Sequence, residues 1–252
     1  MNPSANSQKG HLHPMTQMIR EIQTIFEKIG FEVAQGPELE TEFYNFDALN
    51  IPAGHPARGM QDTFWIKDPK SDVKSQMSKV KNESQSTEHL VLRTHTSPVQ
   101  IRYMQNHKPP FKIIVPGKVY RNEATDATHE AQFHQVEGLY IEEKVSLAEL
   151  KGTLEYFFKA LFGNDVQMRF RPSYFPFVEP GVEVDIFFKG RWLEVMGAGP
   201  VHENVLRMAG IDPEKYSGYA FGGGIDRLLM IRYGLDDIRL LYSGDLRFVN
   251  QF

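Results

Sequence analysis

The fold is decided by the stretch FKIIVPGKVYRNEATDATHEAQFHQVEGLYIE, which runs from residue 111 to residue 142. Its two ends, 111–121 and 132–142, are rich in β-branched and aromatic residues, and a polar segment separates them. This pattern predicts an antiparallel hairpin with a long loop. Strands that return in hairpins, with helices between them, indicate an α+β fold in which helices flank an antiparallel sheet.

The segments around this hairpin predict further elements. Apolar residues at three- and four-residue spacing indicate an amphipathic helix over 15–29. A second helix is expected over 146–162, because Ser146 and Glu149 form a capping box and apolar residues from Leu147 to Leu161 form one face. Two strands, 183–188 and 191–196, flank a short turn. A last strand over 219–221 leads into three glycines and a helix.

Composition narrows the protein class. The chain has 252 residues, a net charge of −4 and no cysteine, so disulfides, thiolate zinc sites and cysteine nucleophiles are excluded. The absence of cysteine also fits a reducing cytoplasm. No run reaches the roughly 18 apolar residues of a membrane helix, and residues 1–10 do not form a signal peptide. A chain with this charge is expected to bind nucleic acid only through a local patch or a partner.

The domain organisation is predicted from local polarity. Residues 1–13 are small and polar, as in a tail or the remnant of a linker, and residues 14–252 are expected to form one domain. Within it, residues 68–89 hold almost nothing that could be buried. We therefore expect a mobile surface insertion there.

Two polar side chains interrupt an apolar strand face. With a period of two, Gln135 and Glu137 share a face with Phe133 and Leu139. Buried polar groups are costly unless they are hydrogen-bonded. One reading is a satisfied internal network or an outward-facing edge. The other is a ligand cavity in which Glu137 holds an ammonium group.

Two arginines occupy positions suited to anions. Arg121 ends its strand beside a polar loop, which suits a bidentate grip on phosphate or carboxylate, although a surface salt bridge is also possible. Arg227 lies in the first turn of a helix, where a positive charge is unfavourable unless an anion is near. The glycines before it, 222–224, suit either a phosphate-binding turn or close packing of strand on helix.

Two further segments allow more than one interpretation of their role. Phe175 and Phe177 place two rings on one side of an extended segment, which is more typical of a core than of a pocket. Glu194 lies between Trp192 and Met196 on one strand face. An acid in such apolar company suits magnesium, an amine or a structural ion pair.

In order along the chain, these motifs resemble the catalytic module of phenylalanyl-tRNA synthetase α subunits, a class II aminoacyl-tRNA synthetase family. The resemblance covers about residues 13–252, apart from the 68–89 insertion. The matching stretches are GPELE (36–40), NFDALNIP (45–52), HPAR (55–58), QDTFW (61–65), RTHTS (93–97), VYR (119–121), FHQVEG (133–138), FPF (175–177) and DLRF (245–248).

The resemblance implies an antiparallel sheet flanked by helices and a two-step reaction. L-phenylalanine and ATP would first give phenylalanyl-adenylate, and the phenylalanyl group would then pass to tRNA(Phe). Mg²⁺ would accompany ATP, and a β subunit would complete an α2β2 assembly. Family members usually begin with a long helical hairpin that grips tRNA. Here only the polar residues 1–13 precede the module, which indicates either a trimmed chain or a naturally short form.

The resemblance also assigns roles to single residues. Arg121 would bridge the substrate carboxylate and the α-phosphate, and Arg227 would bind the γ-phosphate. In the ATP site, Glu123 and His129 would lie near adenine and the outer phosphates, and the ring of Phe133 would stack on adenine. The residues around the amino group and backbone of phenylalanine would be His95, Ser97, Gln135 and Glu137. The phenyl ring would lie against Phe175, Phe177 and Ala220, and Glu179 would bind magnesium.

Two other functions remain open from the residues. A non-catalytic paralogue that binds amino acid or ATP to regulate a partner is expected to lack Arg121 or Arg227, yet both are present. A class II-like ligase that forms an amide on a small molecule would not need tRNA. The phenylalanine-pocket residues argue against it.

Overall fold

The centre of the molecule is a seven-stranded sheet with the strand order β1-β5-β6-β10-β9-β8-β7. The computed structural model describes residues 10–66 and 89–252. β1 pairs in parallel with β5, and every other neighbouring pair in this sheet is antiparallel. The strands are β1 (Glu32–Val33), β5 (Phe111–Tyr120), β6 (Gln132–Glu142), β7 (Gln167–Phe175), β8 (Val178–Phe188), β9 (Arg191–Pro200) and β10 (Ser217–Gly224).

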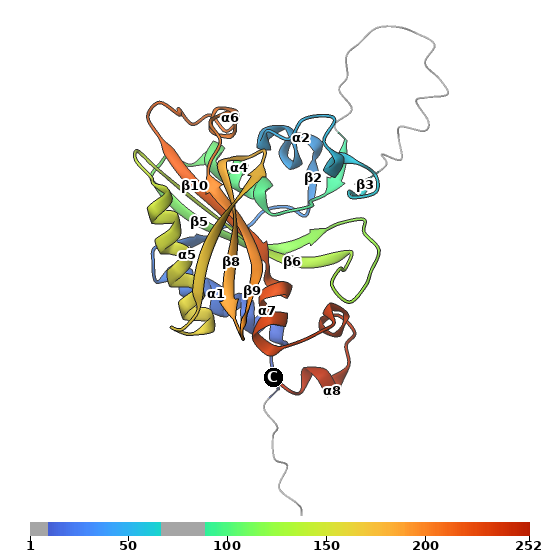
Figure 1. Cartoon of the computed structure of the whole chain (residues 1–252). Coiled ribbons are helices and arrows are strands. Elements are labelled where there is room, and N and C mark those ends of the chain that lie inside the picture. The colour runs from blue at the N-terminus through green and yellow to red at the C-terminus, as the bar shows by residue number, and fades with distance from the viewer. Residues whose placement is uncertain (1–9, 67–88) are drawn as a thin grey trace, which may run out of the picture.

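Helices cover both faces of this sheet (Figure 1). One face packs against α1 (Pro14–Glu27), α5 (Leu147–Phe162) and α7 (Ile225–Tyr233). The other packs against α4 (Ser97–Asn106), α6 (Glu203–Met208) and the short η1 (Asp47–Leu49). The smaller elements are α2 (Glu42–Asn45), η2 (Pro56–Arg58), η3 (Ile238–Leu241), α8 (Leu246–Val249) and a three-stranded sheet of β2 (Leu39–Thr41), β4 (Leu90–Leu92) and β3 (Trp65–Ile66).

The predicted hairpin and helices are confirmed. β5 and β6 pair from Phe111 opposite Ile141 to Tyr120 opposite Gln132. The capping box of Ser146 and Glu149 starts α5. Leu147 is the exception on its predicted apolar face: it is the first residue of the helix and is 38% exposed.

The three glycines do not form a turn, so the phosphate-binding reading of their conformation is wrong. They are the last residues of β10, and α7 begins at the next residue. A Cβ at Gly222 would lie 2.6 Å from Cγ of Glu137, and one at Gly223 would collide with the carbonyl oxygen of Val195. Close packing against the neighbouring strands therefore explains Gly222 and Gly223, whereas a Cβ at Gly224 would meet nothing closer than 3.6 Å.

Two strand-face assignments are also corrected. A β-bulge shifts the pairing between β8 and β9, so that Val184 faces Met196 while Asp185 faces Glu194. The extra residue moves Met196 into the core and leaves Glu194 exposed, and the two do not share a face. In the segment 175–177, only Phe175 is extended, as the last residue of β7, and 176–177 form the tight turn to β8, while the two rings lie on one side as predicted.

Parts of the predicted organisation lie outside the described residues. These are residues 1–9 of the tail and all of the 68–89 insertion except His89. From the rest of the tail, His13 caps α1 by accepting a hydrogen bond from the Met15 amide at 3.1 Å. No helix in the ranges 10–66 and 89–252 is long and apolar enough to cross a membrane.

Candidate active site

A cavity of about 880 Å³ collects most of the predicted site residues, a volume typical of small-molecule sites. It lies against β6, β9 and β10, and the loops around α2, η1 and α6 contribute to its walls. Glu123 and Glu179 do not line it. The predicted residues that do are His95, Ser97, Arg121, His129, Phe133, Gln135, Glu137, Phe175, Phe177, Ala220 and Arg227.

One end of the cavity is an apolar slot. The rings of Phe175 and Phe177 lie almost parallel, with 5.9 Å between their centroids. The ring of Phe175 lies so close to Gly197 that a Cβ there would be 2.9 Å from it. Ala220 supplies a small side chain from β10. Flat walls and small residues of this kind suit an aromatic ring.

A buried carboxylate lies beside this slot. Glu137 is only 5% exposed, and its Oε1 accepts from the Thr96 amide at 3.1 Å. Its Oε2 accepts from the Ser97 hydroxyl at 2.5 Å and the Gln100 amide at 2.8 Å. Burial raises the pKa of Glu137 to about 7, against the lowering effect of the hydrogen bonds from Ser97 and Thr96. The internal network is therefore confirmed, and Glu137 also lines the cavity, while its contact with an ammonium group stays a prediction.

Two cavity side chains lack partners. The Oε1 atom of Gln135 and both ring nitrogens of His95 are buried without a hydrogen bond in the part of the chain that the structure describes. Burial, and then the charge of Arg121, lower the pKa of His95 to about 3, so this imidazole is neutral. Unpaired buried polar atoms are costly. Their presence in the cavity wall therefore points to a polar ligand that pairs with them.

The arginine at the strand end faces an aromatic ring. The guanidinium of Arg121 lies 5.0 Å from the ring centre of Phe133, which comes from the neighbouring strand β6. Glu123 approaches Arg121 only to 4.0 Å, and the arginine side chain stays 42% exposed. This arrangement leaves most of the guanidinium donors available to an anion.

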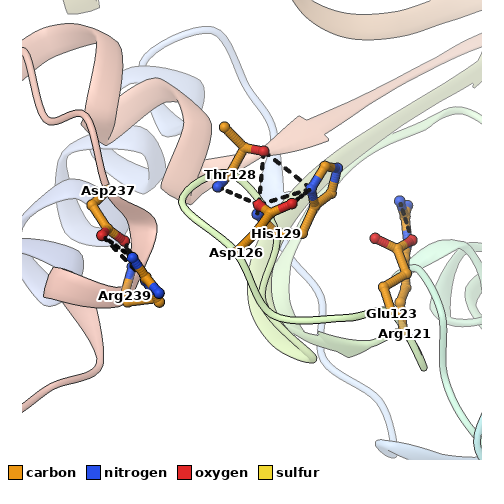
Figure 2. A network of polar contacts seen from close by, with 7 residues as sticks. All are labelled: Arg121, Glu123, Asp126, Thr128, His129, Asp237 and Arg239. Atoms are coloured by element: carbon orange, nitrogen blue, oxygen red, sulfur yellow. Dashed lines mark hydrogen bonds and ion pairs between the residues drawn. The ribbon is translucent and has the colours of Figure 1, made fainter.

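The loop between β5 and β6 is shaped by one aspartate (Figure 2). The carboxylate of Asp126 accepts from the backbone amides of Thr128 and His129 and pairs with the His129 ring at 3.0 Å. These hydrogen bonds hold the pKa of Asp126 well below its usual range. The Ala127 carbonyl also accepts from the Ile238 amide at 2.9 Å, beside the Asp237–Arg239 ion pair. His129 is thereby fixed at the cavity wall.

The first turn of α7 presents a second arginine. In residues 10–66 and 89–252, no side chain forms an ion pair or hydrogen bond with Arg227. Its neighbour Asp226 is buried, accepts from the His134 amide at 2.7 Å and from the Tyr242 hydroxyl, and so ties α7 to β6. Burial raises the pKa of Asp226 to about 6. An unpaired arginine at a helix start favours an anion, as the sequence indicated.

The two acids considered for metal binding differ in position. Glu194 lines the cavity and accepts from Arg171 at 3.1 Å, and Arg171 also binds the buried Asp185 at 2.6 Å. Glu179 is 77% exposed and pairs with His202 at 3.3 Å. Among the described residues, no three His, Asp or Glu side chains are grouped to hold a metal ion. The role of Glu179 stays a prediction.

Sequence reasoning missed the residues that hold Glu137 and Glu194 in place. Gln100 lies on α4, one turn beyond Ser97, and Arg171 comes from the edge strand β7. The signal for Gln100 was available, because the spacing of 97 and 100 puts both side chains on one helix face. Arg171 gave no signal, because its contact with Glu194 depends on strand pairing.

Comparisons with known proteins identify the family. The whole chain, residues 1–252, matches the family described as "tRNA synthetases class II core domain (F)". It is 53% identical to the phenylalanine–tRNA ligase α subunit of Shewanella putrefaciens, over 99% of this chain and 70% of that one. The corresponding protein of Dechloromonas aromatica is 50% identical, over 99% of this chain and 72% of that one.

The solved structures support the same fold. Pyrrolysyl-tRNA synthetase from Desulfitobacterium hafniense superposes with a TM-score of 0.68 at 16% identity, covering 94% of this chain and 76% of that one. A likeness at that identity shows the fold alone, whereas the identity to the ligase α subunits shows the family. The chain belongs to the phenylalanine–tRNA ligase α subunits, and its core is that of a class II aminoacyl-tRNA synthetase.

Proposed function

We propose that the cavity joins L-phenylalanine to ATP, giving phenylalanyl-adenylate and pyrophosphate, and then transfers the phenylalanyl group to tRNA(Phe). One observation carries this proposal. A single cavity combines a slot for an aromatic ring, a buried acid for an ammonium group and two arginines for phosphates.

The end of the cavity that would bind phenylalanine is identified by its aromatic walls and its buried carboxylate. The ring lies against Phe175, Phe177 and Ala220, and the ammonium group is directed to Glu137. An ionised carboxylate offers about four lone-pair sites, of which three are used by protein donors here. One site on Oε1 is left for the substrate. His95 and Gln135 supply the unpaired polar atoms beside it.

The ATP end uses charge and stacking. Phe133 offers its ring to adenine, and His129 and Glu123 lie on the loop toward the outer phosphates. Arg121 holds the substrate carboxylate against the α-phosphate, and Arg227 holds the γ-phosphate. A carboxylate oxygen of phenylalanine forms the new bond to the α-phosphorus, and the bond from that phosphorus to pyrophosphate breaks. No proton moves in this step, so positioning and charge stabilisation suffice.

Mg²⁺ would arrive with ATP and neutralise phosphate charge. It is usually held by one or two carboxylates together with substrate phosphates. Of the two acids considered for metal binding, Glu194 lines the cavity wall, whereas Glu179 is paired with His202 outside it. We therefore assign Glu194 rather than Glu179 as the nearer candidate ligand.

The partners follow from the relatives' description as α subunits. A β subunit is proposed to complete the enzyme as an α2β2 assembly and to supply further tRNA contacts. The net charge of −4 suits a chain that shares tRNA binding with another subunit. Because tRNA is charged where translation occurs, the proposed location is the cytoplasm.

ATP–pyrophosphate exchange with each of the twenty amino acids tests this function, using the chain alone and then with the β subunit. We expect exchange with phenylalanine alone among the twenty. Exchange with a different amino acid would show that the slot does not bind phenylalanine. Silence in both preparations would favour the second candidate, a non-catalytic paralogue that binds amino acid or ATP.

The KM for phenylalanine is expected to depend on pH through Glu137. Because its pKa is raised to about 7, the carboxyl must lose a proton to bind an ammonium group below that pH. The KM should therefore rise about tenfold for each pH unit below 7 and level off above it. Initial rates between pH 5.5 and pH 8 measure this. Glu137→Gln should give a high KM that does not change with pH.

The raised pKa of Glu137 also determines how this residue changes the free energy of unfolding with pH. Between the ordinary pKa near 4.5 and the folded value near 7, the folded state binds more protons than the unfolded state. The contribution of Glu137 to the free energy of unfolding should therefore fall as the pH rises through this range, whereas the lowered pKa of His95 gives a contribution that rises with pH. Comparison with Glu137→Gln isolates the first contribution: the free energy of unfolding of wild type, measured relative to that of the variant by urea unfolding, should fall between pH 4.5 and pH 7.

Ala220→Gly is expected to admit para-substituted phenylalanines. Removing the methyl group deepens the slot where the ring ends, and about one methyl group changes selectivity roughly 10- to 200-fold. Exchange with phenylalanine and its para-chloro analogue, compared as kcat/KM, measures the effect. An unchanged ratio would show that Ala220 is not the pocket floor.

A further inference from the structure

The aromatic turn is held by two hydrogen bonds to its backbone carbonyls. The carbonyl of Pro176 accepts from the side-chain amide of Asn50 at 2.7 Å. The carbonyl of Phe177 accepts from the backbone amide of His202 at 3.0 Å. The Asn50 oxygen in turn accepts from the side chain of Asn204 at 3.0 Å. Segments more than a hundred residues apart in sequence thus meet at this turn.

The backbone and the side-chain amide of Asn50 are both held in one orientation. It ends η1 in the left-handed conformation, with φ 58° and ψ 24°, which asparagine tolerates better than most residues. Its chain neighbours Leu49 and Ile51 are both buried and line the cavity. With its backbone fixed between two packed residues and its oxygen held by Asn204, the amide donor is directed at Pro176.

The turn has few other restraints. It joins β7 to β8, and within the described ranges β7 is the edge of the sheet, with no strand beyond it. From outside the hairpin, the two carbonyls of the turn are held by the Asn50 side chain and by the amide of His202, and the Phe175 ring also packs against Gly197. Because Phe175 and Phe177 flank Pro176, any movement of this carbonyl also moves the two rings that form the slot.

We propose that Asn50 is a positioning residue that sets the width of the aromatic slot by holding Pro176, with Asn204 orienting its amide. The inference rests on the proposed function, because the slot is taken to receive the phenylalanine ring. Nothing in it requires Asn50 to touch the substrate. Its loss should therefore change which ring is accepted more than it changes the rate with a bound substrate.

Asn50→Asp is the sharpest test, because it keeps the size and left-handed preference of the residue and replaces the donor with an oxygen. We expect the preference for phenylalanine over its para-chloro analogue to fall about tenfold, and the KM for phenylalanine to rise, with kcat within about twofold. Asn50→Gly, which keeps the backbone conformation, should shift selectivity in the same way. Asn204→Ala should give a smaller shift.

The matched control is Asn106→Asp, which removes a 2.7 Å bond from a side-chain amide to the Arg102 carbonyl outside the cavity. Selectivity should not change in that variant. Equal selectivity in wild type, Asn50→Asp and Asn50→Gly would overturn the inference, as would a loss of melting temperature with an unchanged preference. If wild type itself shows no phenylalanine-dependent exchange, the proposed function fails instead, so the two failures are distinguishable.

Discussion

Arg121→Ala should abolish phenylalanyl-adenylate formation while the protein stays folded. The side chain lies over Phe133 at the cavity wall and is 42% exposed, so its removal leaves no buried charge without a partner. In the proposed mechanism, the variant loses the positive charge that brings the substrate carboxylate and the α-phosphate together and stabilises the charge that develops between them. Removing one such preorganised donor typically costs 10²–10³ in rate, and a charged one between two anions should cost about 10³ or more.

Phenylalanine-dependent ATP–pyrophosphate exchange measures this loss, with the melting temperature as a check on folding. Arg247→Ala is the matched control, because that arginine is 92% exposed, pairs only with Asp245 among the described residues and lies outside the cavity. It should exchange as wild type does. Near-normal exchange by Arg121→Ala would remove this residue from the mechanism.

Gly138→Ala should cost the fold about 3 kcal/mol or more, at the upper end of the range for overpacked cores. A Cβ at this position of β6 would overlap the ring of Phe221 on β10. That ring stacks on Phe26 with 5.3 Å between centroids, and Phe26 stacks on Phe157 at 4.8 Å. Since all three rings are buried, Phe221 cannot yield without moving α1 and α5.

Thermal or urea unfolding measures the effect, and the melting temperature should fall by about 6–12 °C for a chain of this size. Gly152→Ala provides the opposite expectation, because a Cβ there in the middle of α5 would meet nothing within 4 Å. That variant should gain about 0.5–1 kcal/mol. A Gly138→Ala variant as stable as wild type would mean that the aromatic stack adjusts freely.

Local patterns were enough to predict much of the fold. The hairpin of β5 and β6 and the capped helix α5 follow from residue preferences within one segment, and the structure confirms both. The strand faces were predicted less well where pairing departs from a simple alternation. The bulge beside Val195 depends on the fit of β9 against β8, which no pattern within β9 reveals.

The candidate site shows the same limit. The strand period placed Gln135 and Glu137 on one face, and both line the cavity. The sequence left open whether Glu137 is satisfied internally or faces a ligand, and the structure shows an internal network around a carboxylate that also lines the cavity. Its partner Gln100 comes from another element, 37 residues away. Roles such as the hold of Asn50 on Pro176 depend on distances between segments, which only the folded chain defines.

Because β10 runs directly into α7, the distance between the aromatic slot and the start of that helix is fixed by a single strand. Ala220 at the aromatic slot and Gly224 at the helix start are four residues apart, which at the rise of a strand is about 13 Å. Arg227 follows within the first helical turn, and no flexible loop intervenes. If Ala220 contacts the ring and Arg227 the γ-phosphate, as proposed, the distance between the two substrates is set by a rigid strand and helix, and an amino acid of a different length would place its carboxylate wrongly relative to the α-phosphate.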